Sequence, residues 1–318
     1  MSSARDIKRR IKGVRSTGKI TKAMEMISGV KMRRAVESVM AIRPYAQEML
    51  GILQQISKAM QKTGGDTLSH PFLSNSEGDT DLYVVVTSNR GLCGPFNTNV
   101  IKFLFQILKE RQGRQTKFII IGKKGEQVLM RAQGIKDNVV ATFHDILVQP
   151  TPLGMRAVAQ IIAEELLSKR VHRVEIIWTQ YLSPLLQKVR NSVLFPIDEK
   201  KVAQEIADTS SEEIQKEYAP LDFIIEPSPQ VLLEKIIPQF LEMELLYSLL
   251  ESNASKEALQ MMAMKQATDA ANDMVASLNL SYNQIRQQKI TQEIAELCAG
   301  MEPFSDNFSF SSFFFFLL

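Results

Sequence analysis

The fold is decided by residues 4–60, ARDIKRRIKGVRSTGKITKAMEMISGVKMRRAVESVMAIRPYAQEMLGILQQISKAM, because small or apolar side chains recur there at heptad spacing. Such a repeat is typical of a long helix that packs along a second helix. At roughly 1.5 Å per residue it would be on the order of 85 Å long, far beyond the width of a small domain. The a/d-type positions are Ile7, Ile11, Val14, Gly18, Thr21, Glu25, Ser28, Met32, Ala35, Val39, Ile42, Ala46, Met49, Leu53, Ile56 and Met60.

A partner helix is predicted at the other end of the chain, over residues 231–298. Small and flexible side chains recur in it at the same spacing, so the two terminal helices should pair as an antiparallel coiled coil. Pro44 and Pro238 fall inside the two helices and predict kinks, because proline removes a backbone donor. The heptad positions of the partner helix are Met264, Ala267, Ala271, Met274, Leu278, Ser281 and Ile285.

The seam of the first helix is polar or small over residues 18–28, which we call the polar segment. Here Ile20, Met24 and Ile27 form a displaced apolar set at i, i+4 and i+7, as in the stutter of a coiled coil. We therefore expect the helix to leave its partner partly in this segment and to present a face to another molecule.

Charge is concentrated at the start of the chain, where residues 1–34 hold eleven Lys and Arg against only Asp6 and Glu25. Such a basic block is typical of a nucleic-acid arm, a membrane-surface helix or a helix that meets an acidic protein surface, and it also suits a solvated helix face. The first residues resemble neither a signal peptide nor a transit peptide, so a cytoplasm-like compartment is expected. Cys93 and Cys298 are then expected to be reduced.

Between the helices, short apolar runs alternate with helical segments, which predicts an inserted α/β domain. Only residues 182–187 join its last two strands, so these should form an antiparallel hairpin at one side of the sheet. The predicted fold class is α/β: a long antiparallel coiled coil formed by the N- and C-terminal helices, with an inserted Rossmann-like α/β domain whose mixed sheet carries helices on its faces. Strands are expected at 81–87, 117–121, 139–143, 171–181 and 188–196, and helices at 95–110, from the loop 122–125 through residue 131, and at 153–168.

Two loops resemble nucleotide-binding motifs in their position alone. Residues 88–95 and 122–125 each join a strand to a helix, but neither has the Gly-Lys-Ser/Thr ending or the G-x-G-x-x-G fingerprint. Their glycines more simply make tight turns. His70, His144 and His172 are scattered, and no nucleophile motif or metal-ligand spacing occurs. The sequence therefore predicts no catalytic residues, no metal and no cofactor.

Three separated stretches resemble the gamma subunit of F-type ATP synthase. They are KITKAMEM at 19–26, TSNRGLCG at 87–94, and LSYNQIRQ at 280–287 with ITQEI at 290–294. They occur in the family's order, and the match runs from about residue 4 to residue 300. Asn89 and Pro95 depart from the Asp and Gly that are commoner in the family's loop.

The resemblance implies a central-stalk rotor subunit of the proton-translocating F-type ATP synthase, which performs no chemistry itself. It would couple ion flow through the membrane ring to conformational cycling of the catalytic beta subunits, and it would regulate ATPase activity. The implied partners are the alpha and beta subunits of the catalytic hexamer, the epsilon subunit and the c-subunit ring, with one copy of this chain per complex, no homo-oligomer and no nucleic acid. The implied location is peripheral, on the cytoplasmic side of the cell membrane.

The resemblance also implies contact residues. Lys22, Met24 and Glu25 match the family segment that meets an acidic lever loop of the beta subunits, and they lie in the polar segment. Five residues of the C-terminal helix match positions that interact with beta subunits and with the N-terminal helix. For every one of these residues, an ordinary coiled-coil surface position is the alternative. The five are Arg286, Gln287, Thr291, Gln292 and Glu293.

Members of the family usually finish near the position of Gly300, so the following Ser- and Phe-rich tail is either an artefact or a lineage-specific extension. A basic helix on a long coiled coil also suits a nucleic-acid-binding or scaffolding protein, which would bind DNA or RNA in a salt-sensitive way. A nucleotide-binding α/β enzyme is a third alternative. The expected domains are an N-terminal coiled-coil helix (1–62), an α/β domain (80–200), a connector with a final short strand (201–228), a C-terminal coiled-coil helix (229–300) and an atypical apolar tail (301–318).

Overall fold

The computed structural model describes residues 4–62, 79–147, 150–196 and 228–305. The chain forms two compact units: unit 1 combines Met1–Met24 with Met264–Leu318, and unit 2 is Glu25–Ala263. All but the last residue of the expected connector, and the tail from residue 306 onward, lie outside the described residues.

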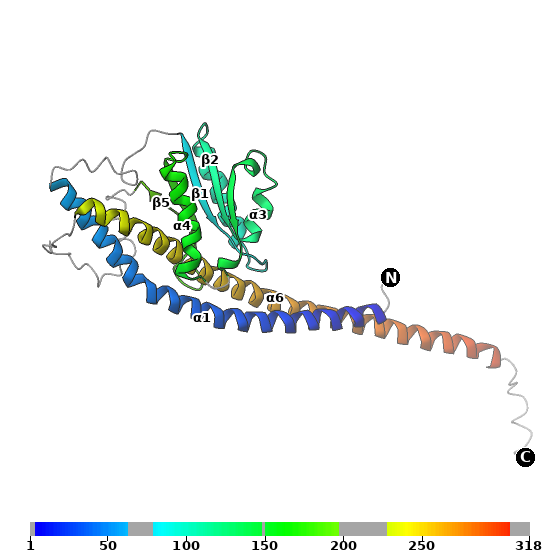
Figure 1. Cartoon of the computed structure of the whole chain (residues 1–318). Helices are drawn as coiled ribbons and strands as arrows, with labels where there is room; N and C mark the ends of the chain where they lie inside the picture. The colour runs from blue at the N-terminus through cyan, green and yellow to red at the C-terminus, as the bar shows by residue number, and fades with distance from the viewer. Residues whose placement is uncertain (1–3, 63–78, 148–149, 197–227, 306–318) are drawn as a thin grey trace, which may run out of the picture. The chain divides into compact units, whose positions relative to one another are not determined.

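Two long helices run through both units: α1 spans Ala4–Lys62 and α6 spans Pro229–Ser305 (Figure 1). Helix α6 thus continues five residues past its expected end at residue 300. Pro44 and Pro238 lie inside helices that continue beyond them, and the kinks expected there stay predictions.

The heptad seam of α1 is confirmed along its described length. Every a/d-type position from Ile7 to Ile56 whose burial is described is buried or half-buried. In unit 1, α1 and α6 run antiparallel, because Gly18 lies against Ala271 while residue 21 meets residue 268. The expected pairing of the terminal helices is therefore correct.

The expectation that α1 leaves its partner in the polar segment is wrong. Gly18 is buried, and a Cβ placed on it would lie 3.3 Å from the Cβ of Ala271. The hydroxyl oxygens of Thr21 and Thr268 lie 2.8 Å apart, and Thr268 also donates to the carbonyl of Met264 at 2.8 Å. Small and mutually bonded side chains bring the helices together here, so the seam needs no apolar residue at these positions.

Unit 2 contains a five-stranded mixed sheet in the order β3-β2-β1-β4-β5. Strands β1 to β4 are parallel, and β5 pairs antiparallel with β4 at the edge, which confirms the predicted hairpin. Three helices of ordinary length and two short 3₁₀ turns connect the strands. The elements are β1 Thr80–Val86, α2 Phe96–Glu110, β2 Gln115–Ile121, α3 Lys123–Leu129, η2 Lys136–Asn138, β3 Val139–Phe143, η3 Asp145–Leu147, α4 Pro152–Leu167, β4 Arg173–Tyr181 and β5 Gln187–Phe195.

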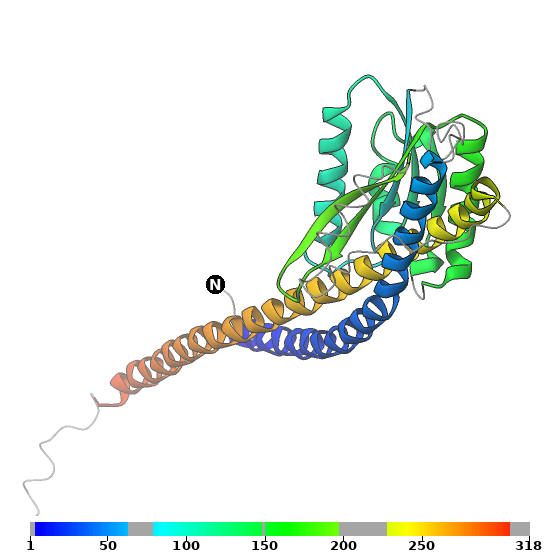
Figure 2. The same cartoon turned by 90° about the vertical axis from the view of Figure 1, so that its left-hand side faces the viewer.

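Alternate residues of the strands face opposite sides, as the pleat of a sheet requires. On one face Leu82, Val84 and the residues of β2 and β4 on the same side share a core with α4 and with the unit 2 parts of α1 and α6. On the other face Tyr83 and Val85 pack with α2 and α3. Figure 2 shows α2 and α4 on opposite sides of the sheet. The helices therefore cover both faces, as the sequence predicts.

The turn after β2 depends on a residue without a side chain. Gly122 has a φ of +109°, and a Cβ placed on it would lie 2.5 Å from the carbonyl oxygen of Thr87. The Thr87 hydroxyl donates to the carbonyl of Ile121 at 3.0 Å and accepts from the amide of Gly125 at 2.9 Å. Gly122 thus lets the two neighbouring βα turns approach closely, in agreement with the tight turn expected from the sequence.

Candidate functional site

The Lys and Arg side chains of the basic block face solvent. All eleven of its Lys and Arg residues are exposed, and the ion pair that Arg9 forms with Asp6 at 3.1 Å is exposed as well. Exposed pairs of this kind contribute little to stability. The positive field of α1 is therefore available to attract an acidic partner.

Apolar side chains also face solvent along the same part of α1. Ile20 in unit 1 is 58% exposed, and in unit 2 Met26 and Ile27 are 65% and 55% exposed. Val30, four residues after Met26, is exposed too. A cluster of exposed large apolar residues in one stretch indicates a protein-interaction surface. We call the unit 2 residues Met26, Ile27 and Val30 the α1 apolar surface.

The predicted residues of α1 lie within this stretch. Lys22 is exposed, whereas Met24 and Glu25 are half-buried. The displaced apolar set of the sequence is thus correct for Ile20 and Ile27, which are mostly exposed. Sequence reasoning missed Met26 and Val30, although their i, i+4 spacing beside Ile27 could have indicated them.

The predicted residues of α6 lie elsewhere on unit 1. Arg286, Gln287, Thr291, Gln292 and Glu293 are all exposed. Two contacts of this group stay on α6: Lys289 pairs with Glu293 at 3.6 Å, and Gln292 donates to Glu296 at 2.9 Å. These i, i+4 contacts leave most of each side chain open to a partner.

Within unit 1, the structure does not bring Lys22 and Met24 together with the five predicted residues of α6. Thr268 lies opposite Thr21, and Arg286 follows eighteen residues later, which is about 27 Å along a helix. Extending the pairing of Gly18 with Ala271 one residue at a time puts Ala4 opposite Ile285. The five α6 residues therefore lie beyond the first described residue of α1.

This unpaired end of α6 carries its own apolar stripe. Ile290, Ile294 and Leu297 are 42%, 55% and 71% exposed. Their i, i+4, i+7 spacing places them on one face of the helix. An apolar stripe of this kind, on a helix end that has no partner among the described residues, indicates a surface that another molecule covers.

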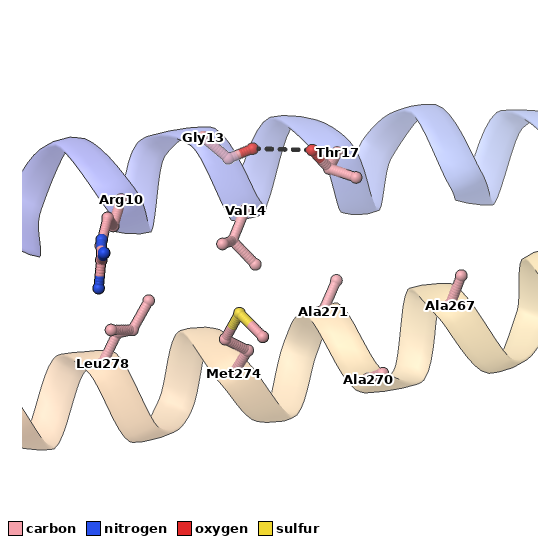
Figure 3. Close-up of a pocket in the computed structure, with 9 residues that line it drawn as sticks. All are labelled: Arg10, Gly13, Val14, Thr17, Ala267, Ala270, Ala271, Met274 and Leu278. Atoms are coloured by element: carbon pink, nitrogen blue, oxygen red, sulfur yellow. Dashed lines mark hydrogen bonds between the residues drawn. The ribbon is translucent and has the colours of Figure 1, made fainter.

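A shallow groove of about 680 Å³ lies between α1 and α6 in unit 1. Figure 3 shows Val14 of α1 and Met274 of α6 pointing toward one another across it. The Thr17 hydroxyl is satisfied within α1 by the carbonyl of Gly13 at 3.2 Å. The lining is apolar apart from Arg10 and Thr17, so it suits packing rather than chemistry. The lining residues are Arg10, Gly13, Val14, Thr17, Ala267, Ala270, Ala271, Met274 and Leu278.

Two glycines of α1 predict opposite results for one substitution. A Cβ on Gly18 would crowd Ala271, whereas a Cβ on Gly13 would have no atom within 4 Å. Gly18→Leu is expected to destabilise the chain by about 1–3 kcal/mol, because the added side chain forces α1 and α6 apart. Gly13→Leu is expected to be neutral or to stabilise by up to about 1 kcal/mol, because glycine weakens a helix interior. Urea denaturation of the two variants measures this difference, and equal midpoints would contradict the close helix contact.

A group of buried titratable side chains in unit 2 forms a network of ion pairs and hydrogen bonds. At the amino ends of β1 and β4, Asp81 and Glu175 are fully buried, and Arg111 pairs with Glu175 at 2.8 Å. Burial lowers the pKa of His172, although its Nε2 lies 3.2 Å from a carboxylate oxygen of Asp81. Burial also raises the pKa of Tyr83 to about 12. His172 is thus a half-buried member of this network.

The loop over residues 88–95 is occupied by its own hydrogen bonds. The amide of Ser88 donates to Asn97 at 2.9 Å, and its hydroxyl donates to the carbonyl of Arg90 at 2.6 Å. Asn89 donates to the carbonyl of His144 at 2.7 Å and accepts from the amide of Lys123 at 3.1 Å. These contacts hold the loop on α2 and on the neighbouring turns at residues 123 and 144.

Among the described residues, no group of three or more His, Cys, Asp or Glu side chains could hold a metal ion. A search of the same residues for a helix long and apolar enough to cross a membrane finds none.

Known proteins are similar to this chain in both sequence and fold. A family model described as ATP synthase matches residues 3–304. The ATP synthase gamma chain of Geotalea daltonii is 37% identical over 304 residues, which cover 95% of this chain and 99% of the relative. That of Heliobacterium modesticaldum is 35% identical over 94% of this chain and 98% of its own length.

Solved structures agree at the level of fold. A chain from the Euglena gracilis mitochondrial ATP synthase, in the structure of its OSCP/F1/c-ring part in rotational state 3, has a TM-score of 0.64 at 17% identity over 97% of each chain. The two long helices, the inserted mixed sheet and the relatives that match almost end to end lead to one conclusion. The chain belongs to the family of ATP synthase gamma chains, the non-catalytic rotor subunits of the central stalk.

Proposed function

We propose that this chain rotates within a hexamer of alpha and beta subunits and couples proton flow through a c-subunit ring to conformational cycling of the catalytic beta subunits. The observation that carries the proposal is the α1 apolar surface beside the exposed Lys and Arg side chains of the basic block. Charge attraction without a fixed ion-pair geometry favours contact with an acidic surface and does not hold one orientation. A rotor needs this combination, because it must meet successive copies of one partner.

The contact residues follow from the same surfaces. Lys22, Met24 and Glu25 contact the beta subunits beside the α1 apolar surface, where Lys22 supplies an exposed charge. A second contact region lies on the unpaired end of α6, in which the apolar stripe supplies the area buried in the complex and the exposed polar residues supply its rim. The residues proposed for this rim are Arg286, Gln287, Thr291, Gln292 and Glu293.

Further partners are proposed from the family and its structures. A solved structure of the Tetrahymena thermophila mitochondrial ATP synthase comprises the central stalk and the c-ring, and a chain in it has a TM-score of 0.56 with this one. We extend the c-ring as a partner to this chain and add the epsilon subunit, through which the chain regulates ATPase activity. In this assembly the chain is present once and is peripheral to the membrane, on its cytoplasmic side.

Assembly tests the proposal directly. The chain is co-expressed with the alpha and beta subunits of a related bacterium, and the purified complex is assayed for ATP hydrolysis. The expected result is a hydrolysing complex with one copy of this chain per three beta subunits. A chain that stayed outside such complexes, and instead bound DNA with a steep salt dependence, would favour the nucleic-acid alternative.

A further inference from the structure

Among the described residues, the end of strand β4 has no neighbouring strand on one side. Strand β1 pairs with β4 only as far as Val85 opposite Ile177, whereas β4 continues to Tyr181. On the other side β5 pairs with β4 up to that residue. Thr179 lies in the overhang and is buried. Its backbone N–H and C=O groups therefore need partners that β1 does not provide.

Helix α6 provides these partners through two serine side chains. The amide of Thr179 donates to Oγ of Ser252 at 3.1 Å, and Oγ of Ser255 donates to the carbonyl oxygen of Thr179 at 3.0 Å. Both serines are buried. They lie three residues apart, so they share one face of α6. The two hydroxyls occupy the place at which a neighbouring strand would bond.

A carboxyl group on the same turn makes a third connection. The indole N–H of Trp178 donates to Oε2 of Glu251 at 3.1 Å, and the hydroxyl of Tyr247 donates to Oε1 at 2.8 Å. Burial raises the pKa of Glu251, while these two hydrogen bonds and the charges of Arg43 and Arg190 lower it. Both oxygens of a fully buried carboxyl group are thus committed to fixed partners.

Apolar packing alone would not fix the rotation of α6 against the sheet. Leu245, Leu249 and Ala254 share the core with β1 and β4, but hydrophobic contact has no preferred direction. Hydrogen bonds depend steeply on distance and angle, and in a buried site they are stronger than in water. The bonds to Trp178 and Thr179 therefore set both the rotation of α6 about its axis and its position along β4.

We propose that Glu251, Ser252 and Ser255 form a torque clamp, a set of positioning residues that lock the end of β4 to α6. The clamp makes the α/β sheet and α6 turn as one body when opposing loads act on them. This inference rests on the proposed rotor function. It adds the place within unit 2 at which torque passes between the sheet and the long helix.

The clamp is tested in the complete ATP synthase, reconstituted into vesicles with the double variant Ser252→Ala/Ser255→Ala. ATP hydrolysis and ATP-driven proton uptake are measured together, first at a low and then at a high opposing proton gradient. The expected result is unchanged assembly and a normal ratio of uptake to hydrolysis at the low gradient. At the high gradient this ratio should fall by about twofold or more, because two directional bonds no longer resist slippage.

Ser248→Ala is the matched control. Ser248 is fully buried one turn before Ser252, and its hydroxyl makes no hydrogen bond among the described residues. This variant should keep the wild-type ratio at both gradients. The proposal is overturned if the double variant also keeps it, or if Ser248→Ala loses as much.

Hydrogen exchange of the isolated full-length chain gives an independent measurement. The Thr179 amide should exchange roughly tenfold or more faster in Ser252→Ala and at the wild-type rate in Ser248→Ala. This result decides on the clamp even if the double variant does not assemble, and an unchanged rate in Ser252→Ala overturns it. A wild-type chain that fails to support proton uptake contradicts the proposed function instead.

Discussion

Gly122→Ala is expected to destabilise unit 2 by roughly 2–5 kcal/mol, the largest stability effect that the structure predicts for a single added methyl group. Two costs combine at this position. The φ of +109° disfavours any residue with a Cβ, and that Cβ would lie 2.5 Å from a backbone oxygen of Thr87. The oxygen belongs to the turn after β1, so it cannot move without opening the neighbouring strand ends.

Gly134→Ala is the control for this experiment. Gly134 also has a positive φ, +78°, but a Cβ on it would have no atom within 4 Å. It should therefore show only the conformational cost, about 1–2 kcal/mol. Urea denaturation of the full chain, followed by circular dichroism, gives both values from the transition midpoints. Equal midpoints for the two variants would show that the contact with Thr87 is not tight.

The double variant Ile20→Asp/Ile27→Asp is expected to lower ATP-driven proton pumping by roughly tenfold or more, because it removes apolar area that the partner covers and adds charge of the partner's own sign. Both side chains are more than half exposed, so the isolated chain should change in stability by less than about 0.5 kcal/mol. Pumping and hydrolysis are measured on the reconstituted complex, and unfolding on the isolated chain.

Met40→Asp distinguishes a general effect of added negative charge on α1 from an effect of the position at which the charge is added. Met40 is also on α1 and 55% exposed, but it lies outside the basic block. Because the surface around Met40 is expected to contact only solvent, Met40→Asp should leave pumping within about twofold of wild type. A double variant that pumps as well as Met40→Asp would remove the α1 apolar surface from the contact with the beta subunits.

Periodicity in the sequence predicts the parts of this fold that depend on local pattern. The seam of α1 and the hairpin of β4 and β5 are two examples, since a heptad repeat and a six-residue connection each allow few arrangements. The repeat places the end of α6 too early, because helix ends are set by local contacts that a repeat does not contain. Pro303, near the observed end at Ser305, also favours an early stop.

Features that depend on partners distant in sequence were not predictable. Thr21 counts as a polar interruption until Thr268 is known to face it. Ser252 and Ser255 carry no signal either, because their partner is the backbone of one strand residue. For the candidate site, spacing found Ile20 and Ile27, but the burial of Met24 depends on how α1 meets α6. Periodicity predicts which faces of a helix are apolar or polar, but not which residues pack against each face.

The hydroxyl pair of Thr21 and Thr268 has a consequence for biosynthesis. These residues are 247 positions apart, so at about 5–20 residues per second the ribosome adds the second roughly 12–50 seconds after the first. During that interval Ile7 and Ile11, at the unit 1 end of the seam, have no partner helix within the chain. Loop-closure entropy grows only slowly with loop length, so the large separation between the two residues costs little free energy. The difficulty is one of timing, because the apolar face of the first helix to be synthesised must be kept from other contacts until the last helix is complete.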